Sequence, residues 1–253
     1  MRTLVGLTVI FLMAVCLPAQ QVPTGTLLPS MLNSSLTSDK ATTGGVISAK
    51  LMQDVPLPDG KKIRRGSKVM GHVVRVAPAS PGHPASIVVQ FDRIVIDGKD
   101  VPVTTSLRAL ASMRAVSTAQ QPVNASSGNG TSVWDWNMVQ VGGQAVYNGQ
   151  RIVKSQTGQV VGKVSEPGAV LAVPLPNPAL GCTGESDSTT EQAFWVFSTD
   201  ACGVYGYSHL ALERGLGGPS GQITLQSPKS ITVRGGSGWL LQVNSAPGSS
   251  AVH

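Results

Sequence analysis

The side chains able to do acid–base or metal chemistry are few and scattered along this chain. None of the 4 histidines has a second histidine, a cysteine or a carboxylate at the spacing of a metal site. A hydrolase of the glycosidase type would need two carboxylates facing one cleft. The sequence pairs none of its candidates, which are Glu166, Glu185, Asp187, Glu191 and Asp200. We therefore predict a protein that is not an enzyme, without catalytic, cofactor-binding or metal-binding residues, and keep an uncharacterised hydrolase as an alternative.

The cysteines predict a disulfide bond rather than a catalytic site. Beyond the N-terminal segment the chain carries Cys182 and Cys202. In an exported chain such a lone pair is typical of a disulfide, and two free thiols are the alternative. Closing a loop of this size should stabilise the fold by about 3 kcal/mol.

Two further clusters could bind a ligand. Trp134 and Trp136 alternate in "WDW", so on a strand both indoles would lie on one face and could stack against a sugar ring. That hypothesis would make the chain a secreted carbohydrate- or surface-binding module. The alternative is that both rings pack against the core or the neighbouring linker.

The second cluster is basic. Five cations fall between positions 61 and 68, and they are Lys61, Lys62, Arg64, Arg65 and Lys68. They are candidates for contact with anionic lipid headgroups or surface polysaccharide. The alternative is that they are the solvated turn of a β-hairpin, where side chains of any charge are exposed.

The N-terminus predicts export. An uncharged apolar run from Leu4 to Leu17 follows Arg2, and a small residue, Ala19, comes shortly after it. This is the pattern of a signal peptide over residues 1–19. A lipidated Cys16 and an uncleaved anchor are the alternatives. We expect the mature protein in the periplasm, at the outer membrane or outside the cell.

The elements that must position these residues are predicted to be strands. The chain has 29 glycines and 17 prolines, and only 13% of its residues are charged, which favours many turns and few helices. Asp97-Gly98 between β-branched runs predicts a hairpin. Residues 67–76 alternate with one slip, which predicts a bulged strand. The fold class predicted is all-β, barrel- or sandwich-like, and the net charge of +6 gives no reason to propose nucleic acid as a partner.

The composition also suggests a division of the chain. Residues 113–132 are rich in Ser, Ala, Gln, Asn and Gly, and we predict a flexible loop there. The loop would separate a β-barrel-like half, 20–112, from a second β half, 133–253, that contains the disulfide.

Four segments in fixed order carry a family resemblance. They are "GTLLPSMLNSSLTSD" (25–39), "GGVISAKLMQDV" (44–55), "IRRGSKVMGHV" (63–73) and "FDRIVIDGKDVPV" (91–103). Over residues 25–107 the chain resembles the C-terminal domain of the TrbI-like scaffold of conjugation and type IV secretion. The remainder is similar to exported bacterial β proteins. The resemblance implies a β-barrel-like domain in a bacterial envelope, with other envelope proteins or further copies of itself as partners.

Overall fold

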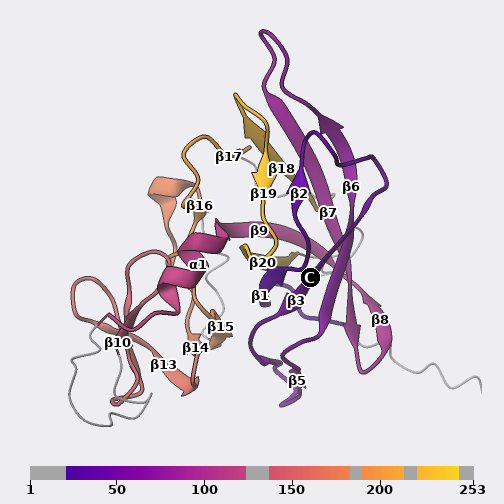
Figure 1. Ribbon diagram of the computed structural model, residues 1–253. Coiled ribbons are helices and arrows are strands. Elements are labelled where there is room, and N and C mark those ends of the chain that lie inside the picture. Colours follow the sequence, from indigo (N-terminus) through magenta and orange to yellow (C-terminus); the bar gives the residue numbers. More distant parts are fainter. Residues whose placement is uncertain (1–20, 124–136, 183–189, 214–220, 245–253) are drawn as a thin grey trace, which may run out of the picture.

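A computed structural model describes residues 21–123, 137–182, 190–213 and 221–244. The predicted signal peptide, Cys16 and the pair Trp134 and Trp136 lie outside these ranges. The described chain is built from strands, with one short α-helix and one 3-10 helix, so the all-β prediction is confirmed (Figure 1). The helices are α1 (Met113–Ala119) and η2 (Pro178–Leu180).

Half of the described strands belong to one large mixed sheet. Its order is β16-β9-β20-β1-β3-β6-β7-β18-β17, with β8 added beside β7. The two edge strands, β16 and β17, come near each other without pairing, so the sheet is strongly curved but is not closed into a barrel. Its strands are β1 (Leu27–Leu32), β3 (Val46–Leu51), β6 (Lys68–Ala77), β7 (Ala85–Ile96), β8 (Lys99–Pro102), β9 (Thr104–Ala111), β16 (Gly203–Tyr205), β17 (Ala211–Leu212), β18 (Gln222–Ser227) and β20 (Gly238–Asn244).

A second sheet of six antiparallel strands follows the chain order from β10 to β15. Two small ribbons, β2 with β19 and β4 with β5, complete the described strands. The bounds are β10 (Asn137–Val139), β11 (Ala145–Tyr147), β12 (Ile152–Lys154), β13 (Val160–Glu166), β14 (Ala169–Ala172), β15 (Gln192–Ala193), β2 (Leu36–Thr37), β19 (Thr232–Val233), β4 (Val55–Pro56) and β5 (Lys62–Ile63).

The large sheet mixes strands from both parts of the chain. β20 lies between β1 and β9, β18 pairs with β7, and β16 pairs in parallel with β9. The division into halves at 20–112 and 133–253 therefore does not describe the structure. Because the C-terminal strands supply ladder partners to the N-terminal ones, the two parts share one fold.

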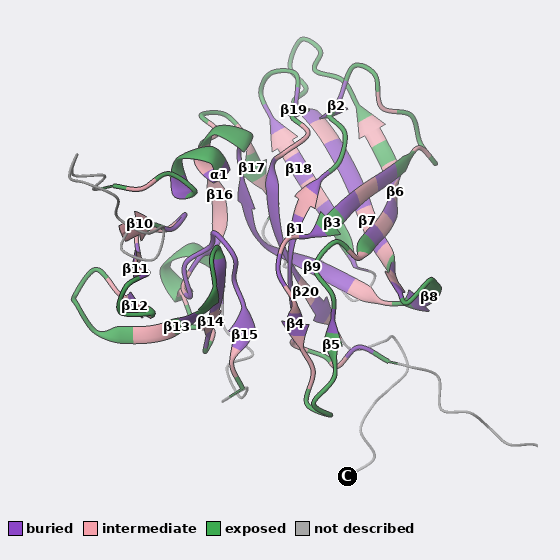
Figure 2. Ribbon diagram, turned by 60° about the horizontal axis from the view of Figure 1, so that its bottom comes forward, coloured by how far each residue is buried: buried purple, intermediate pink, exposed green. Residues whose placement is uncertain are grey.

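The central strands β1, β9 and β20 are buried on both faces (Figure 2). One face packs on a core inside the curved sheet, where Phe91 and Trp239 meet edge to face with ring centroids 5.5 Å apart. The other face packs against the six-stranded sheet through a second core that contains Phe194 and Phe197. In β20 this burial on both faces goes with an unbroken apolar run, Trp239-Leu240-Leu241.

The predicted hairpin and the predicted bulge are both present. Asp97 and Gly98 join β7 to β8 with φ values of 49° and 78°, as a type I′ turn requires. The second strand of the hairpin ends at Pro102, because β9 leaves this edge and pairs with β20. In β6 the register with β7 shifts at Gly71 and again after Val73.

The flexible loop predicted from residue 113 begins instead as helix α1. Ser112 is its N-cap and accepts a hydrogen bond from the backbone N–H of Ala115 at 3.1 Å. Val116 and Ala119, three residues apart, are buried in the second core. This correction covers residues 113–119, whereas residues 124–132 lie outside the described ranges.

Candidate functional site

A cavity of about 240 Å³ lies between the end of α1 and the six-stranded sheet. Strands β11, β13 and β14 contribute lining residues, and so does the segment after β15. Most of the lining is apolar and includes Ala119, Met138, Val146, Val164, Val170 and Trp195. Two buried polar side chains, Gln140 and Asn148, also line it.

Trp195 and Val196 line the cavity, and they belong to a longer wall segment, residues 194–202. Apart from Asp200 its residues are buried. Its backbone pairs with the chain at the isolated bridge between Val141 and Phe197, and the Phe194 N–H donates to the Val170 carbonyl at 3.0 Å. Trp195 has a φ of 50°, which non-glycine residues seldom adopt. Such a buried, irregular backbone must find hydrogen-bond partners outside a β-ladder.

Glutamine side chains supply several of these partners. Gln53 Oε1 accepts from the backbone N–H groups of Trp195 at 2.7 Å and Val170 at 3.2 Å. Gln53 Nε2 donates to the Val170 carbonyl at 2.8 Å, so this side chain acts like a neighbouring strand. Gln144 holds Thr199 in the same way, accepting from its backbone N–H at 2.8 Å and donating to its hydroxyl at 2.5 Å. These side chains fix the wall in place.

The Gln140 side chain also binds the wall segment, but only through the N–H donors of its amide. Its Nε2 donates to the carbonyls of Phe197 at 2.6 Å and Trp195 at 3.2 Å, and this fixes which way the amide points. Its Oε1 is buried and accepts no hydrogen bond, and the same is true of Asn148 Oδ1. Among the described residues the other buried side-chain atom without a partner is Trp239 Nε1, in the other core. Two unpartnered acceptors therefore belong to residues of one cavity.

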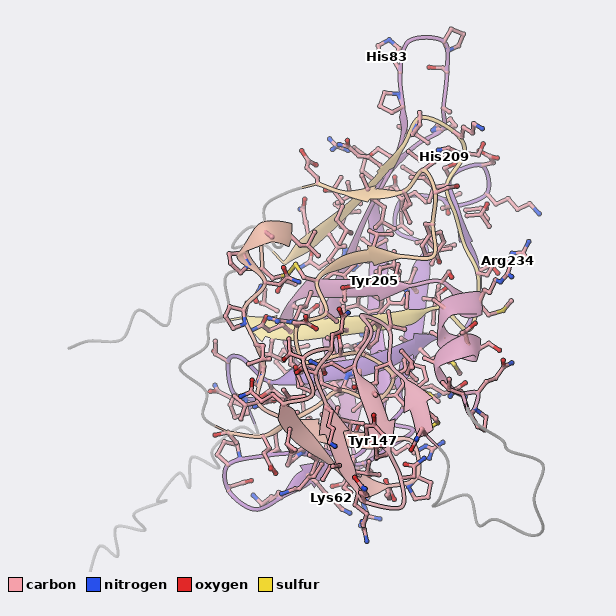
Figure 3. The ribbon with its side chains drawn as sticks, turned by 90° about the vertical axis from the view of Figure 1, so that its left-hand side faces the viewer. Lys62, His83, Tyr147, Tyr205, His209 and Arg234 are labelled. Atoms are coloured by element: carbon pink, nitrogen blue, oxygen red, sulfur yellow. A yellow bond between two sulfur atoms is a disulfide. The ribbon has the colours of Figure 1, made fainter. Side chains whose placement is uncertain are left out.

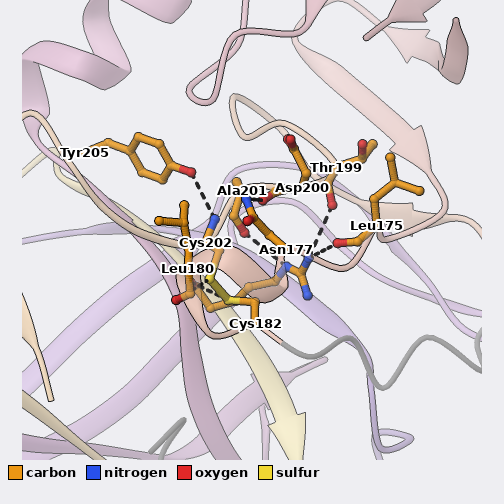
Figure 4. Close-up of a disulfide and its surroundings, with 10 residues drawn as sticks. Leu175, Asn177, Leu180, Cys182, Thr199, Asp200, Ala201, Cys202 and Tyr205 are labelled. Atoms are coloured by element: carbon orange, nitrogen blue, oxygen red, sulfur yellow. Dashed lines mark hydrogen bonds between the residues drawn. A yellow bond between two sulfur atoms is a disulfide. The ribbon is translucent and has the colours of Figure 1, made fainter. Parts of the chain in front are cut away.

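A buried cation, Arg108, anchors the far end of the same segment. Figure 4 shows its surroundings, with Leu175, Thr199 and Ala201 near the disulfide. Arg108 has no partner on β20, because Ala109 pairs with Leu240 while Leu107 pairs with Leu241. Its guanidinium donates to the carbonyls of Ala201, Thr199 and Leu175. Burial lowers the pKa of Arg108, and the nearby Asp200 opposes this shift. These three carbonyls form a cage around the guanidinium, and their hydrogen bonds compensate for burying its charge.

The disulfide lies beside this cage and confirms the predicted pairing. Cys182 and Cys202 are joined across 20 residues of sequence, with Cα atoms 5.9 Å apart. The Cys202 backbone N–H donates to the Tyr205 hydroxyl at 3.0 Å. Burial raises the pKa of Tyr205, so that hydroxyl stays neutral and available as an acceptor.

The basic cluster lies on and after the ribbon β4–β5. Its member Lys62 lies at the end of the molecule opposite His83 (Figure 3). Lys61 pairs with Asp59 at 3.0 Å and Lys62 with Asp54 at 2.6 Å. The other three cations, Arg64, Arg65 and Lys68, are exposed. Lys68 faces Lys50 across the β3–β6 ladder, which concentrates positive charge there. Contact of these five residues with an anionic surface stays a prediction.

The carboxylates considered for a hydrolase have separate surroundings where they are described. Glu191 pairs with Lys163 at 2.6 Å, and Asp200 accepts from the Ser198 hydroxyl at 2.7 Å. Glu166 is exposed at the end of β13. Glu185 and Asp187 lie outside the described ranges, as do Trp134 and Trp136.

The residues that build the cavity were not predicted from sequence. Gln140 and Asn148 lie among apolar residues in "NMVQVGGQAVYNGQ", where a polar residue on a short strand usually indicates a solvated face. Arg108 lies in "SLRALA", and its burial depends on a bulge opposite β20. These residues could have been predicted only with knowledge of which strands pair.

In comparisons with known proteins, the chain matches no family model and no curated protein. Over the residues that the structure describes, no group of three or more His, Cys, Asp and Glu side chains could hold a metal ion. The helices found there are too short or too polar to cross a membrane.

Proposed function

We propose that this chain is a non-enzymatic, exported protein of the bacterial cell envelope that acts as a structural and binding β domain. The observation that carries the proposal is the Cys182–Cys202 disulfide, buried beside Arg108. Structural disulfides persist in oxidising compartments and are rare in the cytosol. The N-terminal pattern around residues 1–19 adds a route to such a compartment.

The resemblance over residues 25–107 supports an envelope scaffold role in particular. The segments that carry it contribute β1, β3, β6 and β7, which are consecutive neighbours in the large sheet. Partners would be other envelope proteins or further copies of the chain. The exposed cations Arg64, Arg65 and Lys68 would add contact with anionic lipid or surface polysaccharide.

The test is to produce the complete chain in a Gram-negative bacterium and fractionate the cells. We expect it in the periplasm or outer membrane, with a mature N-terminus at Gln20, and a native mass that is a multiple of the protomer. A matched chain lacking residues 1–19 should stay in the cytoplasm. Retention of the complete chain in the cytoplasm would refute export, and a strict monomer would refute self-assembly.

A further inference from the structure

We propose that a groove at the start of β3 binds a small amphipathic anion, a carboxylate on a short aliphatic chain. The groove has a volume of about 320 Å³ and lies between β2, the loop that follows β2, and the facing parts of β3 and β6. It shares no lining residue with the cavity beside α1. The proposal is independent of the exported scaffold role.

The apolar part of the groove continues the core inside the curved sheet. Leu36, Ile47 and Val73 line the groove and also belong to this core. Ala41 is partly buried, packs against the same core and lines the groove as well. A ligand with an aliphatic chain would therefore extend an existing core, and each methylene group that it buries there strengthens binding.

The polar part of the groove offers hydrogen-bonding groups that no described residue occupies. The side-chain hydroxyls of Ser34, Thr37 and Thr42 line it without a hydrogen bond to another described residue. The Ser35 hydroxyl accepts from the Gly235 N–H at 3.1 Å and keeps its own proton to donate. These hydroxyls are available to donate to an anionic oxygen.

One cation sets the charge of the ligand. Lys40 is exposed, lines the groove and makes no ion pair with another described residue. Its sequence neighbour Asp39 accepts instead from the hydroxyls of Ser38 and Ser230, at 3.1 and 3.2 Å, and none of the described residues that line the groove is acidic. A carboxylate could therefore accept hydrogen bonds from the ammonium and from the neighbouring hydroxyls together.

The backbone holds the groove in shape before any ligand arrives. The Ala41 N–H donates to the Thr37 carbonyl, and the Gly45 N–H donates to the Thr42 carbonyl, both at 2.9 Å. The Val73 N–H donates to the Gly45 carbonyl at 2.8 Å, which ties this loop to β6. A preformed site avoids the free-energy cost of ordering its walls on binding.

The size of the groove sets the length of the chain. A cavity of about 150 Å³ is known to accept benzene, which has six carbon atoms. The groove, at about 320 Å³, has roughly twice that volume and room for a chain of about eight carbon atoms with its carboxylate. Octanoate is therefore the probe that fits it.

The experiment titrates the full, disulfide-bonded chain with octanoate, butyrate and octanol by calorimetry. Butyrate has the carboxylate but half of the chain, and octanol has the chain but no charge. We expect saturable binding of octanoate, with butyrate and octanol each at least about fivefold weaker. Failure of octanoate to saturate, or an affinity for either of the other probes equal to that for octanoate, would overturn the proposal.

Two variants assign the binding to the groove. Lys40→Gln removes the cation, so octanoate should bind about fivefold more weakly while octanol is unaffected. Lys99→Gln, at an exposed position of β8, is the matched control and should alter neither. Ala41→Leu fills the apolar end of the groove and should weaken octanoate at least about tenfold, whereas Ala79→Leu, at an exposed position beyond β6, should not. An octanoate affinity that is unchanged in Lys40→Gln would contradict the role of the cation.

NMR locates the probe directly. Octanoate should shift the amide resonances of Thr37, Ala41 and Gly45. Shifts confined to residues of the other cavity, such as Val146 and Val170, would place octanoate there and refute the assignment of the groove. Urea unfolding shows whether each variant keeps its fold, and if Ala41→Leu does not fold, the comparison of Lys40→Gln with Lys99→Gln still decides the question.

Discussion

Arg108 shows how a single residue can organise an irregular part of this fold. It is 3% exposed and, among the described residues, makes no ion pair within salt-bridge distance, yet it donates to three backbone carbonyls. These carbonyls belong to segments that no ladder holds together. The guanidinium thus connects β9 to the chain on both sides of the disulfide.

Replacing Arg108 with methionine should therefore destabilise the protein strongly. The change keeps most of the apolar stem but leaves the Ala201 and Leu175 carbonyls without the guanidinium, while the Thr199 carbonyl keeps the Leu175 N–H. We expect this to cost about 3 kcal/mol. Urea unfolding measures the loss. The control is Arg75→Met, at an exposed position of β6, which should change stability by less than about 0.5 kcal/mol. A loss no greater than that of the control would contradict the role of Arg108.

Gln53 plays a similar part between β3 and the second sheet. Leucine at this position would keep the volume but leave the N–H groups of Val170 and Trp195 without their acceptor. We expect Gln53→Leu to lower the free energy of unfolding by about 2–3 kcal/mol. Gln121→Leu, at an exposed site beyond α1, is the matched control. Equal denaturation midpoints for the two variants would show that Gln53 is not needed.

At the scale of elements, the longest hairpin depends on a close backbone approach. A Cβ atom at Gly71 would lie 2.0 Å from the Gln90 carbonyl oxygen and 2.8 Å from the Phe91 Cα. Gly71→Ala should therefore force β6 away from β7 and cost several kcal/mol, on the order of 3. Thermal unfolding checks this.

Gly66 provides the comparison for that measurement. It has a φ of 88° but open space around a Cβ, so Gly66→Ala should cost only about 1 kcal/mol of backbone strain. Should the two alanine variants be equally stable, the close approach at Gly71 would not restrict that position.

The contribution of Asp54, beside the ribbon β4–β5, to the stability of the fold should depend on pH. A backbone bond from Arg65, at 2.7 Å, and the Lys62 ammonium lower the pKa of Asp54 below its ordinary 3.8. A lowered carboxyl pKa stabilises the fold fully above 3.8, and this contribution disappears as pH falls through the lower, folded value.

The Arg65 amide resonance followed by NMR gives the measurement for Asp54. Between pH 5 and pH 2 it should move with an apparent pKa below 3.8, and Asp54→Asn should abolish that movement. An inflection at or above 3.8 in the unaltered protein would contradict the hydrogen bond.

Local chemistry explains which elements could be predicted. Asp97-Gly98 correctly predicted a hairpin because a type I′ turn needs positive φ at both positions. That requirement depends on these two residues alone and not on distant partners. Helix α1 escaped prediction because two turns bury only Val116 and Ala119, too few positions to establish a helical period. Its N-cap, Ser112, is a weak signal in a chain rich in serine.

At the scale of the whole molecule, the arrangement of strands could not be read from local patterns. The pairing of β20 with β1 and β9 joins residues more than a hundred positions apart, and the alternation within each strand is compatible with many partners. The cavity depends on that arrangement, since its lining comes from α1, the second sheet and the segment after β15. The sequence could therefore predict the fold class and the disulfide, but not the site.

The central claim is that this protein works in an oxidising compartment, and the state of its cysteines in the cell tests it most directly. Cells making the complete chain would be quenched in acid, and free thiols would be titrated on the denatured protein with and without reductant. The account predicts that Cys182 and Cys202 are blocked until reductant is added, in protein recovered from the envelope fraction. Two free thiols without reductant, in protein recovered from the cytoplasm, would contradict it.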